Sequence, residues 1–322
     1  MIEEPGKAAE DVTAQETTTG RPPAVRPVLV SVDAVASLRA RGVPLDPVAP
    51  LGRLIRENGR AAQALYKAEI DAGVDVLFAL TSGTAPRSLS PIGMAFRAAA
   101  LTGAAVDLAV EAASAASRRV AVAGILGRFG AGTSTGDNDR LAEDYATHAA
   151  RLAAAGCEIL VACGFAPSLS GSLPPGIARL ARRAAVVSAS ATQLATWALF
   201  EMQAGGRTAD GEGIEDVARG ALDGGADTIL IEVPSTDLGL SALARLDRAR
   251  DDGQLGLLLD APDAGAGAAG AGAIDAWVAS ALRLFDGGAR ILGGGAGTTV
   301  EHLSALAKGL RENRRTPLWR RL

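Results

Sequence analysis

The sequence has little of what several large classes of protein require. Only 3% of its 322 residues are aromatic, so aliphatic side chains and alanine have to fill most of the core. Its two cysteines, Cys157 and Cys163, do not make a disulfide framework. No apolar run approaches the roughly 18 residues of a membrane-spanning helix. The formal net charge of −4 also argues against a nucleic-acid surface. We therefore expect a protein that binds neither membrane nor nucleic acid.

The beginning of the chain has no apolar segment of the kind found in signal peptides. Residues 1–26 are polar, with four acidic residues among the first eleven, and they show no hydrophobic periodicity. Such composition is typical of a disordered tail. We expect a soluble cytoplasmic protein with a folded domain over 27–312 and a basic tail over 313–322.

Short apolar runs alternate with stretches of helical periodicity along the rest of the chain. The runs lie at 28–32, 74–80, 119–124, 158–163, 184–190, 227–233, 255–260 and 289–292. Strands that alternate with helices form a parallel sheet, and eight such units fit a (β/α)8 TIM barrel. An open doubly wound sheet is the rival fold, but no GxGxxG follows the first run. The sequence therefore predicts an α/β protein with a single TIM barrel.

Residues that can do chemistry are expected where barrel strands end. Glu232 and Asp260 end neighbouring strands, so their carboxyl groups are expected to approach one another and to support acid–base catalysis if burial separates their pKa values. Alternatively, both are solvated or paired with a loop arginine such as Arg87 or Arg128. Cys163 is a candidate nucleophile or, since no histidine is expected nearby, an inert thiol.

The last strand, turn and helix have a distinctive sequence. "ARILGGGAGTTVEHLSALAKGL" (289–310) resembles the C-terminal signature of the homocysteine S-methyltransferases, in which a strand is followed by Gly-Gly-Cys-Cys-Gly-Thr and then by Pro-Glu-His. Other segments agree in order, including "AEIDAGVDVLFALTSGT" (68–84) and "AAAGCEILVACG" (153–164). The resemblance spans residues 28 to 310 and also implies a TIM barrel.

The resemblance implies a zinc ion bound by three cysteine thiolates, one after the sixth strand and two in the turn after the eighth. Here those positions hold Val233, Gly295 and Ala296, which offer no ligand atoms. Zinc deprotonates and positions a substrate thiol. We therefore expect no zinc and no other cofactor. A new metal site made of Cys163, Glu232 and Asp260 is the alternative.

The contacts that the family makes with its substrate are also reduced in this sequence. Thr81 matches the last residue of the family's Thr-Asn-Thr, and Asp33 lies two residues after the position of its first-strand Asp-Gly. In the glycine turn, the candidates are Gly294, Gly295 and Thr298. The backbone N–H groups of this turn are an alternative site for an anion.

Three functions fit these observations. We favour a non-catalytic subunit or regulator that binds a protein, either a catalytic paralogue, a corrinoid protein or a second copy of itself. The second is an enzyme of changed chemistry that uses Glu232, Asp260 and Cys163 at the barrel mouth. The third is a thiol or homocysteine methyltransferase without its own zinc, which requires a thiol activator that no residue clearly supplies.

Overall fold

Eight parallel strands form a sheet that closes on itself. The strands are β1 (Val28–Leu29), β2 (Val76–Ala79), β3 (Ala121–Leu126), β4 (Ile159–Phe165), β5 (Ala195–Glu201), β6 (Thr228–Val233), β7 (Gln254–Leu259) and β8 (Ile291–Gly294). Their order in the sheet is β1-β8-β7-β6-β5-β4-β3-β2. A parallel bridge between Val30 and Val76 joins its two ends. The computed structural model, which describes residues 26–127, 138–165, 175–246, 254–261 and 270–315, thus confirms the predicted TIM barrel.

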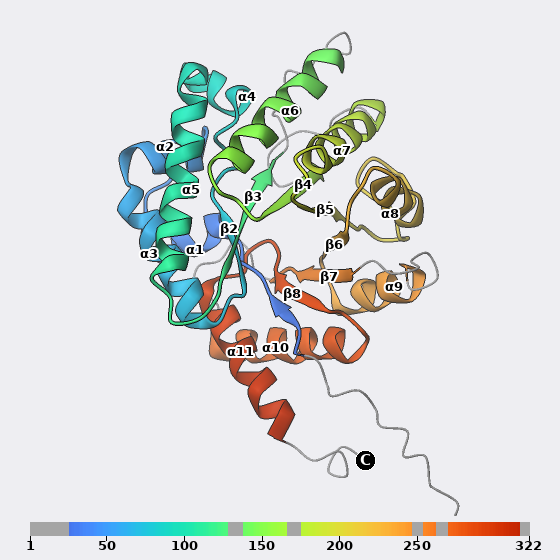
Figure 1. Cartoon of the computed structure of the whole chain (residues 1–322). Helices are drawn as coiled ribbons and strands as arrows, with labels where there is room; N and C mark the ends of the chain where they lie inside the picture. The colour runs from blue at the N-terminus through green and yellow to red at the C-terminus, as the bar shows by residue number, and fades with distance from the viewer. Residues whose placement is uncertain (1–25, 128–137, 166–174, 247–253, 262–269, 316–322) are drawn as a thin grey trace, which may run out of the picture.

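The helices lie outside the ring of strands (Figure 1). They are α1 (Ala34–Ala40), α2 (Pro50–Glu57), α3 (Gly59–Ala72), α4 (Pro86–Leu89), α5 (Ala98–Ser114), α6 (Asn138–Ala154), α7 (Pro175–Ser190), α8 (Ile214–Asp223), α9 (Thr236–Leu246), α10 (Ala271–Asp286) and α11 (Val300–Arg315), with 3₁₀ turns η1 (Ser90–Ile92) and η2 (Ala95–Arg97). Within the described ranges, no helix is both long and apolar enough to cross a membrane.

The ends of the chain were expected to be tails over 1–26 and 313–322. Of the first segment the structure describes Arg26, whose guanidinium bonds Asp75 at the start of β2. Helix α11 continues to Arg315, three residues past the expected end of the folded domain. The remaining residues of both predicted tails lie outside the described part of the chain.

The fifth strand is not where the sequence pattern put it. Residues 184–190 belong to helix α7, and β5 follows at Ala195–Glu201. A short apolar run does not distinguish a buried strand from a buried helical segment by periodicity alone. In α7, Ala185 and Ala189 are buried while Val187 is 48% exposed, which is the pattern of a helix with one covered face. The fifth strand therefore ends at Glu201.

Alternate side chains of each strand point into the barrel or out toward the helices. The interior cluster consists of Val30, Val76, Ala123, Ile125, Ile159, Val161, Trp197, Leu230, Leu258 and Ile291. Gly256 lies among them with no room for a larger residue. A Cβ atom there would lie 2.5 Å from Leu230 Cδ2 and 2.7 Å from Ile291 Cβ. Close packing of this interior fixes the strands whose ends form the barrel mouth.

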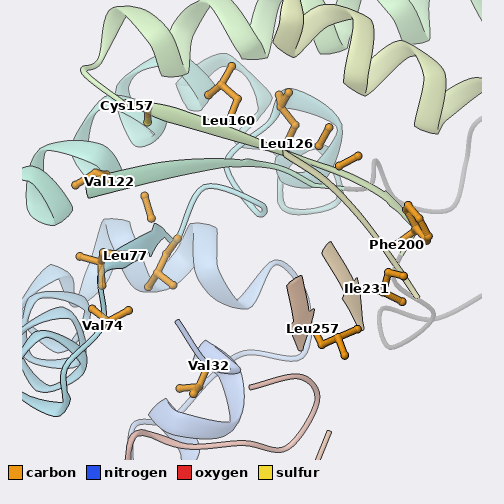
Figure 2. Packing of buried hydrophobic residues seen from close by; sticks show 14 of the residues in the cluster. Val32, Val74, Leu77, Val122, Leu126, Cys157, Leu160, Phe200, Ile231 and Leu257 are labelled. Carbon is orange, nitrogen blue, oxygen red and sulfur yellow. The ribbon is translucent and has the colours of Figure 1, made fainter. Parts of the chain in front are cut away.

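A second, larger cluster fills the layer between strands and helices. Figure 2 shows part of it, including the strand residues Leu77, Leu160 and Ile231, all of which are buried. Val233 belongs to this outer cluster as well. Its side chain therefore packs with the layer that faces the helices, although it follows Glu232 directly in the sequence.

Replacing Gly256 with alanine should lower the free energy of unfolding by about 1–3 kcal/mol, because the added methyl group overpacks the barrel interior. Urea denaturation followed by circular dichroism measures the change. Gly103→Ala in α5 is the control, since a Cβ atom there meets nothing within 4 Å. It should be neutral or slightly stabilising. Equal stability of the two variants would contradict the interior packing described here.

Candidate active site at the carboxyl end of the barrel

Two carboxyl groups meet at one backbone N–H in the barrel mouth. Glu232 lies near the end of β6, and Asp260 follows β7 directly. The N–H of Ala296 donates to Glu232 Oε1 at 2.9 Å and to Asp260 Oδ1 at 2.8 Å. Backbone bonds hold this geometry, because Asp260 N donates to Val233 O at 3.0 Å and Ala261 N donates to Ala296 O at 2.9 Å. The structure thus brings together the two acids singled out in the sequence.

Asp33 connects the loop after β1 to the turn after β8 by hydrogen bonds. Its Oδ1 accepts from the N–H groups of Val35 and Ala36, which caps α1. Its Oδ2 accepts from Gly297 N at 3.0 Å. Carboxylates therefore occupy the N–H groups of both Ala296 and Gly297, and their charge repels anions. This arrangement opposes the expectation that the turn binds an anion through its backbone.

The remaining residues of the turn are packed against these groups. Thr298 is fully buried, and its Oγ1 donates to Gly295 O at 2.7 Å and accepts from Asp33 N at 3.2 Å. A Cβ atom at Gly294 would lie 2.1 Å from Thr298 Oγ1, and one at Gly295 would lie 2.1 Å from Asp260 Oδ1. The two glycines are required because a side chain at either position would collide with the site.

The two carboxyl groups differ in how readily they ionise. Burial raises the pKa of Glu232 well above its usual value, and the charges of Asp260 and Glu201 raise it further. Burial also raises the pKa of Asp260, but the hydrogen bonds from Ala296 N–H and from the Glu232 carboxyl oppose this increase. Of the two groups, Glu232 is therefore the one that holds a proton more strongly, with Asp260 as its hydrogen-bond partner.

Neither carboxyl group has a cationic partner among the residues that the structure describes. Arg87, one of the two arginines considered for this role, pairs with Asp144. Arg128, the other, lies outside the described residues. The negative charge of the pair is thus offset within the described site by backbone N–H groups and by the shared proton.

Cys163 and Glu201 lie beside the acid pair. Burial raises the pKa of the Cys163 thiol to about 12, with contributions from the negative charges of Glu232 and Glu201. A thiol with such a pKa is protonated at neutral pH and is a poor nucleophile. Glu201 pairs with Glu232 in the β5–β6 register. It is the site residue that the sequence reasoning missed, and the strand-like run "ATWALFE" was the signal that could have located it.

Thr81 has a structural role in this arrangement. Its hydroxyl accepts from Ile125 N at 2.7 Å and donates to Ile125 O at 3.1 Å, so it joins the loop after β2 to β3. The histidines also lie away from the acid pair, as expected. His302 packs edge-on against Trp277 of α10 with ring centroids 5.2 Å apart, and His148 is buried in α6.

The residues present do not fit the zinc ion of the resemblance. Val233 packs in the outer cluster, and Gly295 has no space for a thiolate because Asp260 occupies it. Ala296 contributes its N–H to the carboxyl groups and has no donor atom in its side chain. Within the described ranges, no group of three or more His, Cys, Asp or Glu side chains is placed to hold a metal ion.

Comparison with known protein families identifies a family for this chain. The family model of the homocysteine S-methyltransferases matches residues 46–310. The chain therefore belongs to the homocysteine S-methyltransferase family. A search of curated protein sequences found no match.

Solved structures of the homocysteine methyltransferase MmuM from Escherichia coli share the fold. Its metallated form has a TM-score of 0.69 and 19% identity, and its oxidised form has a TM-score of 0.68 and 20% identity. Each alignment covers 88% of this chain and 96% of the other. At this level of identity, the structural similarity establishes the barrel fold and does not extend to the chemistry of the site.

Glu232→Gln should stabilise the protein at alkaline pH. A carboxyl group with a raised native pKa loses its proton first in the unfolded chain, so stability falls as pH rises from about 4.3 through the native pKa. The glutamine amide keeps an oxygen for Ala296 N–H and a donor for Asp260 without ionising. We expect similar stability of variant and wild type near pH 4 and a gain of at least about 1 kcal/mol at pH 8.

Urea denaturation across this pH range measures the difference between variant and wild type. Burial raises the pKa of Glu69 to about 7. Because this residue is present in both proteins, its contribution to the pH dependence of stability cancels in the difference. Glu301→Gln is the control of opposite sign, because the pKa of Glu301 is lowered in the folded protein. A stability difference for Glu232→Gln that does not change with pH would mean that this carboxyl group ionises normally.

Proposed function

We propose that this protein is a zinc-independent member of its family in which Glu232 and Asp260 perform acid–base chemistry on a small substrate at the barrel mouth. The observation that carries the proposal is the convergence of both carboxyl groups on the N–H of Ala296. A purely non-catalytic subunit would tolerate a mouth closed by apolar side chains. The polar, proton-sharing arrangement of this mouth therefore favours an enzyme of changed chemistry over a non-catalytic subunit.

The two acids have distinct roles in this proposal. Glu232 retains its proton because of burial and the adjacent charges, so it is the general acid. Asp260 is the more readily ionised member and is the general base. Environments that separate the pKa values of two carboxyl groups are the usual basis for dividing acid and base roles between them. Glu201 supports the division, since its charge disfavours ionisation of Glu232.

The negative charges of Glu232, Asp260 and Glu201 oppose a zinc-independent transfer of a methyl group to a thiol. Attack by sulfur requires a thiolate, and a free thiol has a pKa of about 8.5. Negative charges around a buried thiol raise that pKa, as they do for Cys163. A homocysteine thiol in this mouth would therefore remain protonated, and the site supplies no metal ligand set to deprotonate it.

The acid–base proposal can be tested with a mixture of natural metabolites in place of a single chosen substrate. Purified protein is incubated in D₂O with a metabolite extract of the cells that make it, and products and carbon-bound deuterium are measured by mass spectrometry. The wild type should alter at least one metabolite, with or without a chelator. Glu232→Gln and Asp260→Asn should each lower that rate at least about a hundredfold.

Glu301→Gln, outside the acid pair, is the matched control and should keep the wild-type rate. Three results would overturn the proposal: no metabolite altered by the wild type, a rate that a chelator abolishes, or a rate that survives both substitutions in the acid pair.

A second candidate function, the binding of a protein partner, is favoured by a different observation. Phe96 in η2 is 81% exposed, and Arg97 Cζ lies 5.7 Å from the centre of its ring. Aromatic residues and arginine are enriched in protein interfaces and among their main energetic contributors. We propose this pair as the contact for a catalytic paralogue or a corrinoid protein.

Affinity purification of the tagged protein from its own cells tests the partner. A methyltransferase or corrinoid protein should co-purify in near-equal amount with the wild type and be lost with Phe96→Ser. Leu180→Ser on α7, which removes another exposed apolar side chain, should leave the complex intact. A wild-type protein that purifies alone, or a complex that Phe96→Ser leaves unchanged, would count against this function.

A further inference from the structure

A pocket outside the barrel lies between helices α7 and α8, apart from the acid pair. Its volume is about 410 Å³, which lies in the usual range for small-molecule sites. Phe200 of β5 forms part of its apolar floor, together with Val186 of α7 and with Val217 and Ala221 of α8. These four side chains are buried in the protein. The base of the pocket is therefore lined by apolar side chains.

A glycine and a buried ion-pair network shape the pocket. Gly220 lines it, and a Cβ atom at this position would meet nothing within 4 Å. At one edge, the side chain of Arg182, 8% exposed, donates to Asp210 Oδ1 and Oδ2 at 2.8 Å each and also bonds Glu212. Thr208 Oγ1 donates to Asp210 Oδ1 at 2.6 Å. The edge is thus fixed before any ligand binds, which favours affinity.

Most charged side chains around the pocket are paired with each other. Arg179 Nε lies 2.7 Å from Glu212 Oε1, and Asp216 Oδ1 lies 3.2 Å from Arg219 Nη1. Arg183 of α7 and Asp223 of α8 also line the pocket. In the described part of the chain, neither of these two has an ion pair or a side-chain hydrogen bond.

The two unpaired charges lie on opposite walls of the pocket, Arg183 on α7 and Asp223 on α8. A Cβ atom at Gly224, the residue after Asp223, would lie 3.1 Å from Val186 Cγ1. Val186 is one helical turn along α7 from Arg183. Among the described residues, the pocket therefore has one cation without an ion pair on the α7 wall, one anion without an ion pair on the α8 wall, and an apolar floor.

We propose that this pocket binds a free α-amino acid with an apolar side chain. The Arg183 guanidinium would take the carboxylate, for which its planar fork of donors is suited. The Asp223 carboxylate would take the ammonium group, and the apolar side chain would lie on Phe200 and Val217. This site is independent of the acid pair and of the partner contact at Phe96, so its failure would leave both of those proposals standing.

Isothermal titration of the full chain with L-leucine tests the site. Two probes each lack one charge: 4-methylpentanoate has no ammonium group and L-leucinamide has no carboxylate. Each should bind about tenfold more weakly than L-leucine, the usual effect of losing a hydrogen bond between charged groups. Binding of 4-methylpentanoate as tight as that of L-leucine would overturn the role of Asp223, and the same result with L-leucinamide would overturn that of Arg183.

Variants tie the binding to this pocket. Arg183→Ala should weaken the binding of L-leucine about tenfold and leave the binding of L-leucinamide unchanged. Asp223→Ala should weaken the binding of L-leucine about tenfold and leave the binding of 4-methylpentanoate unchanged. Gly220→Leu fills the pocket and should abolish binding. Gly103→Leu is the matched control, since it makes the same change at another open position in a helix and should retain binding.

Three further results would contradict the proposal. The wild type could fail to bind L-leucine, or Gly220→Leu could bind it as well as Gly103→Leu does. Sedimentation could also show a wild-type dimer that Gly220→Leu converts to a monomer, in which case the groove is an interface between two copies of this chain.

Discussion

The N–H of Ala296 is the group on which the barrel mouth depends. Glu232 and Asp260 both direct an oxygen to it, so the ends of β6 and β7 are joined to the turn after β8. The next N–H, of Gly297, extends the connection to Asp33 after β1. Because carboxyl oxygens fill this space, residue 295 has no room for a side chain. The glycine at residue 295, and with it the absence of a thiolate there, thus follows from this packing constraint.

That constraint also sets the chemistry of the mouth. Carboxyl groups crowded away from water retain protons more strongly than free ones. Burial, with a contribution from the negative charges nearby, raises the pKa of the Cys163 thiol. In this chain, the mouth of the barrel holds two carboxyl groups at one backbone N–H. The pocket between α7 and α8 differs from this mouth, since its two unpaired charges are of opposite sign and lie over an apolar floor.

Sequence reasoning reached most of the mouth because strand ends are easy to locate when an apolar run stops at a polar residue. This reasoning predicts Glu232 and Asp260, the family resemblance adds Asp33, and the structure brings all three to one turn. The sequence pattern does not point to Glu201, because the apolar run at 184–190 favours a strand there and the structure places β5 at Ala195–Glu201. Thr81 follows β2 as the sequence predicts, and its hydroxyl bonds the backbone of Ile125.

The sequence by itself determined the alternation of strands and helices, the family, and the absence of ligand atoms at Val233, Gly295 and Ala296, because these depend on residue type and order. The tertiary structure alone decided which partners those residues have. Whether residues 184–190 form a helix depends on which face is covered, and local periodicity over seven residues does not reveal that. The sharing of one N–H by two carboxyl groups, and the isolation of Arg183 from Asp223, depend on distances between segments far apart in the chain.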